Sequence, residues 1–197
     1  MGYSFHARGI VFLRSDKLYM KKNSVFIATS LDGFIADKNG GLDWLQELPN
    51  PEKNDMGYAD FMQRIDALLM GRKTFETICG FDGPWPYHKP VFVLSNRLPE
   101  IPKGYKGKAF LVNGSLTSVL SQINALGHNN LYIDGGITVQ SFLKEDLIDE
   151  LIITTFPILL GGGTPLFSEL PERRNFELAG FASFLNAVTQ SQYLRKR

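Results

Sequence analysis

The sequence has little cysteine and little net charge. Its 197 residues include one cysteine, Cys79, so the chain cannot form an internal disulfide. A single thiol is typical of a reducing compartment, and we expect a cytoplasmic protein in which Cys79 fills a core position. Lysine and arginine exceed aspartate and glutamate by one, which gives a net charge of +1. This balance provides no electropositive surface for nucleic acid or for an anionic membrane.

Long apolar runs and metal-ligand patterns are also missing. No apolar run reaches the ~18 residues that a membrane-spanning helix needs, and none near the N-terminus is long enough for a secretory signal. The histidines His6, His88 and His128 are far apart, and they lack the spacing of a metal site. We therefore expect no membrane, nucleic acid or metal partner. A small molecule or a second copy of the chain is expected instead.

The composition is that of one soluble domain. It is 44% hydrophobic and 21% charged, and a chain of this length can bury a sizeable core. Residues 1–19 do not join clearly to the rest of the chain, whereas residues 20–197 form a continuous pattern. We interpret residues 1–19 as an N-terminal extension of unknown role, either functional or the product of an upstream start.

Short apolar runs rich in β-branched residues alternate with amphipathic segments. Strands are expected at 24–30, 67–70, 90–94, 109–112, 131–133 and 149–156, and helices at 55–65, 74–79, 116–126 and 138–143. This alternation predicts an α/β fold, in which a mixed, mostly parallel sheet has helices on both faces. Two last strands, 176–185 and 187–195, turn at Asn186 and add an antiparallel hairpin. The glycine-rich loop 37–44 is of a kind that can act as a lid.

The stretch from Ala67 to Thr77, ALLMGRKTFET, is a buried strand that ends at Gly71 and passes directly into a helix. Glycine lets the backbone bend and lets a ligand approach closely. The start of the helix offers unpaired N–H groups and a partial positive charge, to which Arg72, Lys73 and the Thr74 hydroxyl add donors. The pattern favours a phosphate site, although an ordinary strand-to-helix turn with two solvated cations has the same residues.

Two further polar turns follow strands of the same sheet. Residues 134–138, DGGIT, expose backbone N–H groups before a helix, without the G-x-G-x-x-G pattern of dinucleotide folds. Residues 95–97, SNR, end another strand. Because ligands of such sheets bind beyond the carboxyl ends of the strands, all three turns can hold one ligand. Two donor clusters suit a pyrophosphate and Arg97 suits an extra phosphate, which together indicate a phosphorylated dinucleotide such as NADPH.

Five motifs resemble those of a known family: SLDGFIA at 30–36, LLMGRKTFE at 68–76, VFVLSN at 91–96, LYIDGG at 131–136 and PILLGGGTPLF at 157–167. In this order and spacing they resemble the dihydrofolate reductase superfamily, and most closely the branch that contains the reductase domain of riboflavin biosynthesis. The resemblance covers residues 24–197. It implies a dihydrofolate-reductase-like three-layer fold, an NADPH-dependent oxidoreductase activity and a homodimer.

The resemblance also implies which residues bind the cofactor. The turns at Gly71 and Gly135 match the two parts of the family site that hold the cofactor phosphates. The turn at Ser95 matches the strand end that recognises the adenosine 2′-phosphate, which favours NADPH over NADH. The first strand and Ile35 match the wall beside the nicotinamide. The full set is Ala28, Thr29, Ile35, Gly71, Arg72, Lys73, Thr74, Ser95, Asn96, Arg97, Gly135, Gly136 and Thr138.

Four residues are candidates for the substrate side. Dihydrofolate reductases hold their substrate ring with one carboxylate, which also helps protonation. Asp55 precedes Gly71 by the family's usual interval, but an acid at a helix start is also a common cap. Asp32 lies near the end of the first strand, although Asp-Gly is first a turn signal. Thr154 matches a substrate-facing strand position or is an ordinary β-branched strand residue, and Trp44 lies in the loop over the reaction centre.

The sequence thus predicts an NADPH-dependent reductase that resembles 5-amino-6-(5-phosphoribosylamino)uracil reductase of riboflavin biosynthesis. A dihydrofolate reductase and a non-catalytic NADP-binding protein are the alternatives. The expected substrate is a small heterocyclic or phosphoribosyl compound. An aromatic loop, Trp85 to Tyr87, would either rim the pocket for a flat heterocycle or pack as an ordinary loop.

Overall fold

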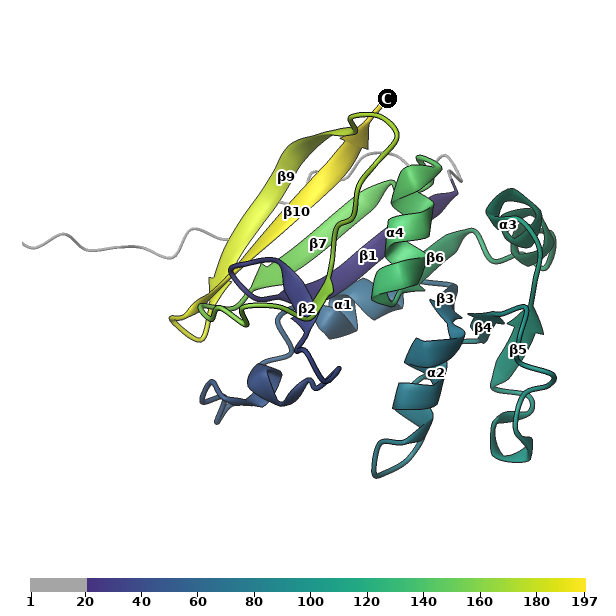
Figure 1. Ribbon diagram of the computed structural model, residues 1–197, viewed down its shortest axis with the longest axis horizontal. Coiled ribbons are helices and arrows are strands. Elements are labelled where there is room, and N and C mark those ends of the chain that lie inside the picture. The colour runs from purple at the N-terminus through teal and green to yellow at the C-terminus, as the bar shows by residue number, and fades with distance from the viewer. Residues whose placement is uncertain (1–20) are drawn as a thin grey trace, which may run out of the picture.

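The computed structural model describes residues 21–197, so the expected extension at residues 1–19 lies outside the described residues. Its main sheet has eight strands in the order β5-β4-β3-β6-β1-β7-β10-β9 (Figure 1). These strands are β1 Lys22–Thr29, β3 Ala67–Gly71, β4 Val91–Leu94, β5 Ala109–Val112, β6 Asn130–Asp134, β7 Glu150–Thr155, β9 Asn175–Phe184 and β10 Val188–Lys196. Strands β1 and β3 to β7 are parallel, whereas β10 runs antiparallel to both β7 and β9. The predicted mixed sheet with a C-terminal hairpin is confirmed.

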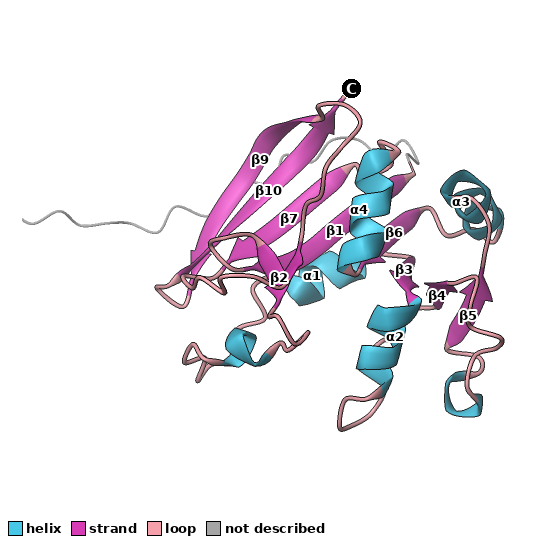
Figure 2. Ribbon diagram, viewed as in Figure 1, coloured by secondary structure: helices cyan, strands magenta, loops and turns pink. Residues whose placement is uncertain are grey.

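Helices cover both faces of the sheet and make the predicted three layers (Figures 1 and 2). Among residues 21–197 the four helices are α1 Tyr58–Gln63, α2 Arg72–Cys79, α3 Leu116–Ala125 and α4 Gly136–Lys144, and two short 3-10 helices are η1 Asp43–Gln46 and η2 Lys103–Tyr105. Side chains of α1 and α2 pack into a core on one face, and those of α3 and α4 pack into a core on the other. Within the same residues no helix is long and apolar enough to cross a membrane.

Strand β3 explains how one short segment supports both cores. Ala67 and Leu69 belong to the core under α3 and α4, while Leu68 and Met70 belong to the core under α1 and α2. Successive strand residues point to opposite faces of a sheet, so an unbroken apolar run fits a strand that is covered on both sides. All four side chains are fully buried. Packing on both faces therefore fixes the position of the end of β3, where the turn at Gly71 begins.

Three local features differ from the sequence expectation. Helix α1 begins at Tyr58 rather than at residue 55, because Met56 and Gly57 have positive φ angles of 54° and 85° and cannot belong to a helix. The loop after residue 37 contains η1. A small second sheet, which pairs β2 (Phe34–Ala36) with β8 (Thr164–Pro165), was not predicted. Two- and three-residue strands give too little periodicity to be recognised in a sequence.

A buried carboxylate joins α1 to the sheet. Glu150, at the start of β7, is fully buried, and its oxygens lie 3.1 Å from Lys22 Nζ and 2.8 Å from Arg64 Nη1. Gln192 Nε2 donates to the same carboxylate at 2.6 Å. Burial acts to raise the pKa of Glu150, but the two cations outweigh it and lower the pKa to about 2. The group is therefore ionised in the folded protein over the whole neutral range.

This pairing makes the stability of the fold sensitive to acid. The pKa of Glu150 falls from 4.5 to about 2 on folding, so its stabilisation is present above pH 4.5 and is lost as the pH falls toward 2. A shift of this size corresponds to about 3 kcal/mol. In urea unfolding, Glu150→Gln should lower the free energy of unfolding by about 2–4 kcal/mol at pH 7 and by much less near pH 3.

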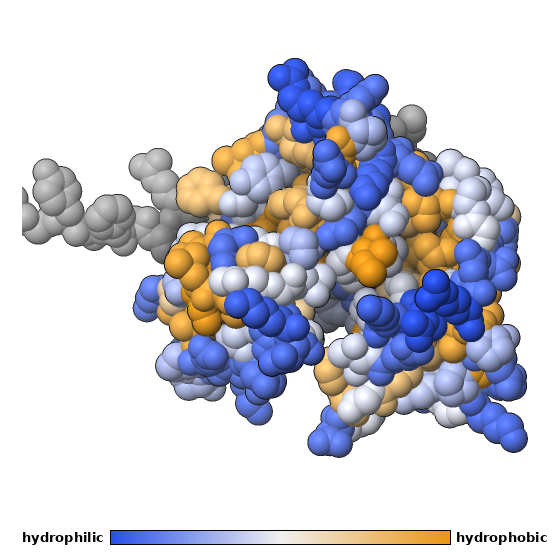
Figure 3. Space-filling view, in the orientation of Figure 1, coloured by the Kyte–Doolittle hydropathy of each residue, from blue (hydrophilic) through white to orange (hydrophobic). Residues whose placement is uncertain are grey.

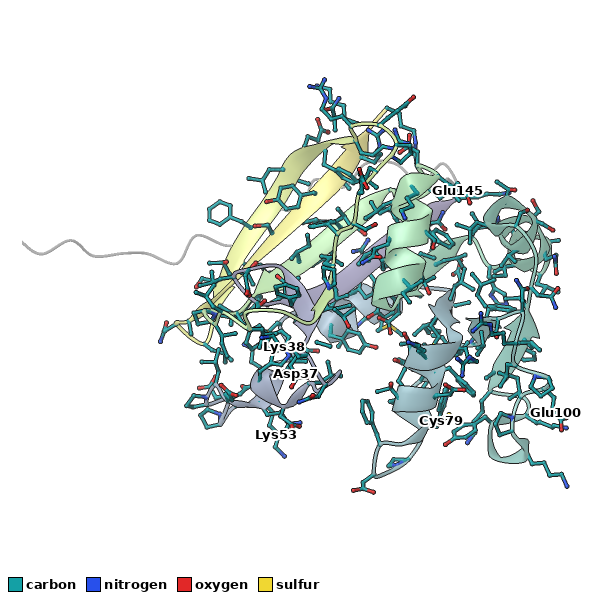
Figure 4. All side chains as sticks on the ribbon, viewed as in Figure 1. Asp37, Lys38, Lys53, Cys79, Glu100 and Glu145 are labelled. Atoms are coloured by element: carbon teal, nitrogen blue, oxygen red, sulfur yellow. The ribbon has the colours of Figure 1, made fainter. Side chains whose placement is uncertain are left out.

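The exposed pair of Glu100 with Lys106 supplies the control for Glu150. Glu100 lies on the surface at the far end of the sheet (Figure 4). Glu100→Gln should change the free energy of unfolding by less than about 1 kcal/mol at both pH values. If the free energy of unfolding fell equally in the two variants, the buried ion pairs of Glu150 would stabilise the fold no more than the exposed pair of Glu100 does.

Candidate functional site

Two of the three expected turns touch each other. Strands β3 and β6 are neighbours, with Met70 opposite Asp134, so Gly71 and Gly135 follow at adjacent strand ends. A Cβ atom on Gly71 would lie 2.9 Å from Thr138 Oγ1, and one on Gly135 would lie 2.1 Å from Thr74 Oγ1. Gly135 also has a φ of +89°, which only glycine adopts readily. Both turns need glycine because each packs against the threonine of the other.

The helices that leave these turns both begin without a cap from the described residues. Neither α2, after Gly71, nor α4, after Gly135, has a side-chain cap or an acidic residue in its first turn. Their first N–H groups and the positive ends of their dipoles therefore remain available to an anion. Ile35 lies close to the second turn, since a Cβ atom on Gly136 would be 2.8 Å from Ile35 Cδ1. The geometry suits a pyrophosphate with an apolar group beside it.

The third expected turn lies next to the first. Strand β4 pairs with β3 so that Leu94 lies opposite Gly71. Ser95 follows, and its Oγ accepts from the N–H groups of Arg97 at 3.1 Å and Leu98 at 3.0 Å. Strongly hydrophilic residues gather over α2 and β4 in Figure 3.

The three expected cations of these turns differ in how they are held. Arg97 and Lys73 are exposed and form no ion pair within residues 21–197, whereas Arg72 is tied to Glu76 at 2.7 Å. Arg97 and Lys73 are therefore available to an additional phosphate. Arg72 would have to leave Glu76 to contact one.

Beside the two turns lies a carboxylate that the sequence analysis did not select. Asp134 ends β6 on the face covered by α1 and α2, two residues after Tyr132, which belongs to the core on that face. Its Oδ1 accepts from the Gly135 N–H at 2.8 Å. Burial raises the pKa of Asp134 to about 6 and outweighs the hydrogen bond from the Gly135 N–H, which lowers it. A carboxyl group with such a pKa can exchange a proton near neutral pH.

Three tyrosines lie near enough to Asp134 for its charge to affect their pKa values. Burial and the charge of Asp134 raise the pKa of Tyr58 to about 12, and the same two causes raise the pKa values of Tyr87 and Tyr132. All three hydroxyls are therefore protonated donors, and that of Tyr132 donates to the carbonyl of Phe26 at 2.9 Å. Figure 3 shows the surface hollowed between the part around η1 and the part around α2. Aromatic walls with a few polar groups are typical of sites for flat heterocycles.

The two carboxylates that were expected to contact the substrate, Asp55 and Asp32, both accept hydrogen bonds from backbone N–H groups. Asp55 is exposed, and its oxygens accept from the N–H groups of Gly57 at 3.0 Å and Ala59 at 2.8 Å at the start of α1. Asp32 accepts from the Ser30 hydroxyl at 2.6 Å and from the N–H groups of Leu160 and Gly161. These bonds, the one from Ser30 first, lower the pKa of Asp32. Each carboxylate therefore has a local role in the fold.

Thr154 and Trp44, the other two expected residues, are buried. Gln190 Nε2 donates to Thr154 Oγ1 at 2.9 Å. Trp44 packs edge-on against Phe156 with ring centroids 5.4 Å apart, and it lines a cavity of about 210 Å³. Its indole N–H has no partner within the described part of the chain. A buried donor of this kind is available to a ligand or to water.

The sequence contained a usable signal for Asp134. It stands in the motif LYIDGG, and the alternation of a strand places it on the same face as Tyr132. Nothing in the sequence indicated that Tyr58 lies near that face, because it comes from a distant helix. Of the expected aromatic loop, Trp85 packs against Phe75 with centroids 6.0 Å apart, while Tyr87 lies near Asp134.

Comparisons with known proteins show the family of the chain. A family model described as RibD C-terminal domain matches residues 22–189. Uncharacterized protein YwjB of Bacillus subtilis (strain 168) is 36% identical over 178 residues, which are 89% of this chain and 98% of YwjB.

Two solved structures are similar to this chain. A candidate riboflavin biosynthesis protein from Shewanella sp. PV-4 has a TM-score of 0.87 and 56% identity, and the match covers 89% of this chain and 99% of that protein. The dihydrofolate reductase of Enterococcus faecalis, solved with NADP(H), shares the fold with a TM-score of 0.63 and 19% identity, over 91% of this chain and all of that one. The chain therefore belongs to the RibD C-terminal domain family, a reductase-like family with the fold of dihydrofolate reductase.

Proposed function

We propose that this protein is an NADPH-dependent reductase whose substrate is a phosphoribosylamino-pyrimidine of the kind used in riboflavin synthesis. The observation that supports it best is the meeting of two uncapped helix starts, at Gly71 and Gly135, beside the half-buried carboxyl group of Asp134. The reductase-like family and the dihydrofolate-reductase fold agree with it.

In this proposal the cofactor lies across the carboxyl ends of β3, β4 and β6. Its pyrophosphate accepts hydrogen bonds from the N–H groups that begin α2 and α4. Its 2′-phosphate lies near the exposed cations Arg97 and Lys73, because β4 brings Ser95 beside the first turn. Its nicotinamide lies toward Ile35, which contacts the second turn, and toward Ala28 and Thr29 at the end of β1.

The residues around Asp134 would provide the remaining chemistry. When bound, NADPH supplies a hydride and becomes NADP⁺. The hydride adds to a C=O or C=N carbon of the substrate, and the oxygen or nitrogen of that bond takes one proton. Asp134 would give that proton, since with a pKa of about 6 a fraction of it is still protonated near neutral pH. Tyr58 and Tyr87 would donate hydrogen bonds to the pyrimidine.

Asp55 makes dihydrofolate the less favoured substrate. A pterin needs a buried carboxylate for a paired hydrogen bond, and Asp55 is exposed and bonded to the start of α1. Asp134 lies instead at the end of β6, beside the turn at Gly135. The proposed substrate is therefore one whose reacting C=O or C=N bond lies next to Asp134. It does not need a carboxylate that pairs with a ring amidine, as a pterin does.

The first prediction from this proposal concerns Gly135. Thermal-shift and fluorescence titrations of the wild type should detect NADPH binding, and NADPH absorbance should fall when the pyrimidine is added. In Gly135→Ala the new Cβ meets Thr74 Oγ1 at a φ of +89°, so α4 must move. We expect the Kd for NADPH to rise by at least about tenfold, as the loss of one charged hydrogen bond would cause.

Gly107 provides a matched control, because its φ is +82° and a Cβ there meets nothing within 4 Å. Gly107→Ala should keep the wild-type Kd. The absence of NADPH binding in the wild type would reject the proposal. Binding without turnover would instead favour the non-catalytic NADP-binding alternative.

Arg97 should separate the two nicotinamide cofactors. It is exposed and has no acidic partner within residues 21–197. Arg97→Ala should raise the Kd for NADPH by about 10- to 100-fold and leave the Kd for NADH within about threefold, because only NADPH has the 2′-phosphate. Lys108→Ala serves as the control for general loss of positive charge. Equal weakening of both cofactors would remove Arg97 as the 2′-phosphate contact.

Asp134 should determine the pH dependence of the reaction. An acid that gives a proton must be protonated, so kcat of the wild type should fall as the pH rises above about 6. Asp134→Asn should lower kcat by about 10²–10⁴-fold and abolish that dependence, while the Kd for NADPH stays near the wild-type value. A variant with the wild-type pH profile would show that the proton comes from elsewhere.

A further inference from the structure

The turn before α1 has an unusual backbone conformation. Met56 and Gly57 have φ angles of 54° and 85°, in the left-handed region that a residue with a side chain seldom adopts. A conformation of this kind persists only where surrounding contacts hold it. The N–H groups of Met56 and Gly57 donate to Asn54 Oδ1 at 2.8 Å and to Asp55 Oδ1 at 3.0 Å. These two bonds lie within the turn, so they do not fix its position relative to the sheet.

A glutamine of β10 joins this turn to the sheet. Gln190 Nε2 donates to the Met56 carbonyl at 3.0 Å and to Thr154 Oγ1 at 2.9 Å. A carbonyl oxygen only accepts, so the amide nitrogen of Gln190 must face it. Gln190 lies directly opposite Thr154 where β7 pairs with β10, and Thr154 is buried. The sheet therefore fixes Gln190, and Gln190 fixes the turn.

Tyr58 is the first residue of α1 and comes directly after this turn. The other end of the six-residue helix is held by the buried Phe61 and by the ion pair of Arg64 with Glu150. The start of the helix is held by the turn, since the Tyr58 N–H donates to the Asp55 carbonyl at 3.1 Å. The position of Tyr58 therefore depends on the position of the turn.

The Tyr58 side chain belongs to the group of tyrosines near Asp134. Burial and the charge of Asp134 raise the pKa of Tyr58 to about 12. Its ring packs edge-on against Phe26, with centroids 5.6 Å apart. The hydroxyls of Tyr105 and Tyr132 donate to backbone carbonyls, whereas that of Tyr58 forms no hydrogen bond within residues 21–197. The Tyr58 hydroxyl is thus available to donate to a ligand.

We propose that Gln190 is a positioning residue, which holds the turn at Met56 so that the Tyr58 hydroxyl stays near Asp134, where the substrate would bind. This inference rests on the proposed function. Gln190 acts through the Met56 carbonyl and needs no contact with substrate or cofactor. A side chain of similar length without N–H donors leaves the turn free to move. The loss then falls on KM rather than on kcat, because a hydrogen bond to the bound ring is made in the ground state and in the transition state alike.

The first test is a double-mutant cycle with NADPH and the phosphoribosylamino-pyrimidine. Tyr58→Phe and Gln190→Met should each raise KM by about 3- to 10-fold, the effect of one neutral hydrogen bond, and keep kcat within about twofold. Gln190→Glu can still bond the Thr154 hydroxyl but cannot donate to Met56, so it should behave like Gln190→Met. Gln190→Met combined with Tyr58→Phe should have the KM of Tyr58→Phe within about twofold, because both changes remove one contact. Additive losses would overturn the proposal.

The second test needs no substrate, so it separates a failure of this inference from a failure of the proposed function. In protein that contains 3-fluorotyrosine, the fluorine NMR resonance of Tyr58 is assigned by its loss in Tyr58→Phe. This resonance should shift or broaden in Gln190→Met. The matched control is Gln192→Met, because Gln192 is also on β10 but donates to Glu150 at 2.6 Å. In this control the resonance should keep its wild-type position.

Near-ultraviolet circular dichroism checks that both glutamine variants are folded. An unchanged Tyr58 resonance in Gln190→Met, or an equal change in Gln192→Met, would overturn the proposal. A wild type without turnover that shows the expected resonances would reject the proposed function and still assign the position of Tyr58 to Gln190.

Discussion

The close packing of Gly135 against Thr74, and of Gly71 against Thr138, is the constraint on which the site depends. A side chain at either glycine would push the starts of α2 and α4 apart. Because β3 and β6 are buried on both faces, their ends cannot move to relieve such a contact. The two helix starts are therefore fixed as one surface of N–H donors, and every function considered for this cleft requires that surface.

Two carboxylates, the fully buried Glu150 and the half-buried Asp134, have pKa values shifted in opposite directions by their surroundings. Glu150 lies between Lys22 and Arg64, and its pKa falls to about 2, so it serves as a permanent charge that holds α1 on the sheet. Asp134 has no cation beside it among residues 21–197, and its pKa rises to about 6. The first carboxylate is suited to structure and the second to proton transfer. They stand near opposite ends of the parallel strands, on the same face.

Much of the fold was predictable from the sequence, because it depends on local pattern. Buried strands such as β3 are unbroken apolar runs, and the glycines that end them are visible in the motifs LLMGRKTFE and LYIDGG. The three turns were assigned to one edge because parallel strands have their carboxyl ends together. The start of α1 was misplaced because the positive φ angles of Met56 and Gly57 result from the path of the loop, which local propensity does not report.

The sequence by itself determined the sheet, its three donor turns and the resemblance to a reductase family, since each depends on residues close in the chain. Only the tertiary structure decided that the pKa of Asp134 is raised and that of Asp32 is lowered. Asp32, Asp55 and Asp134 look alike in sequence, but desolvation and nearby charge depend on segments far apart in the chain. The same holds for Glu150, whose two cations, Lys22 and Arg64, come from β1 and from the end of α1.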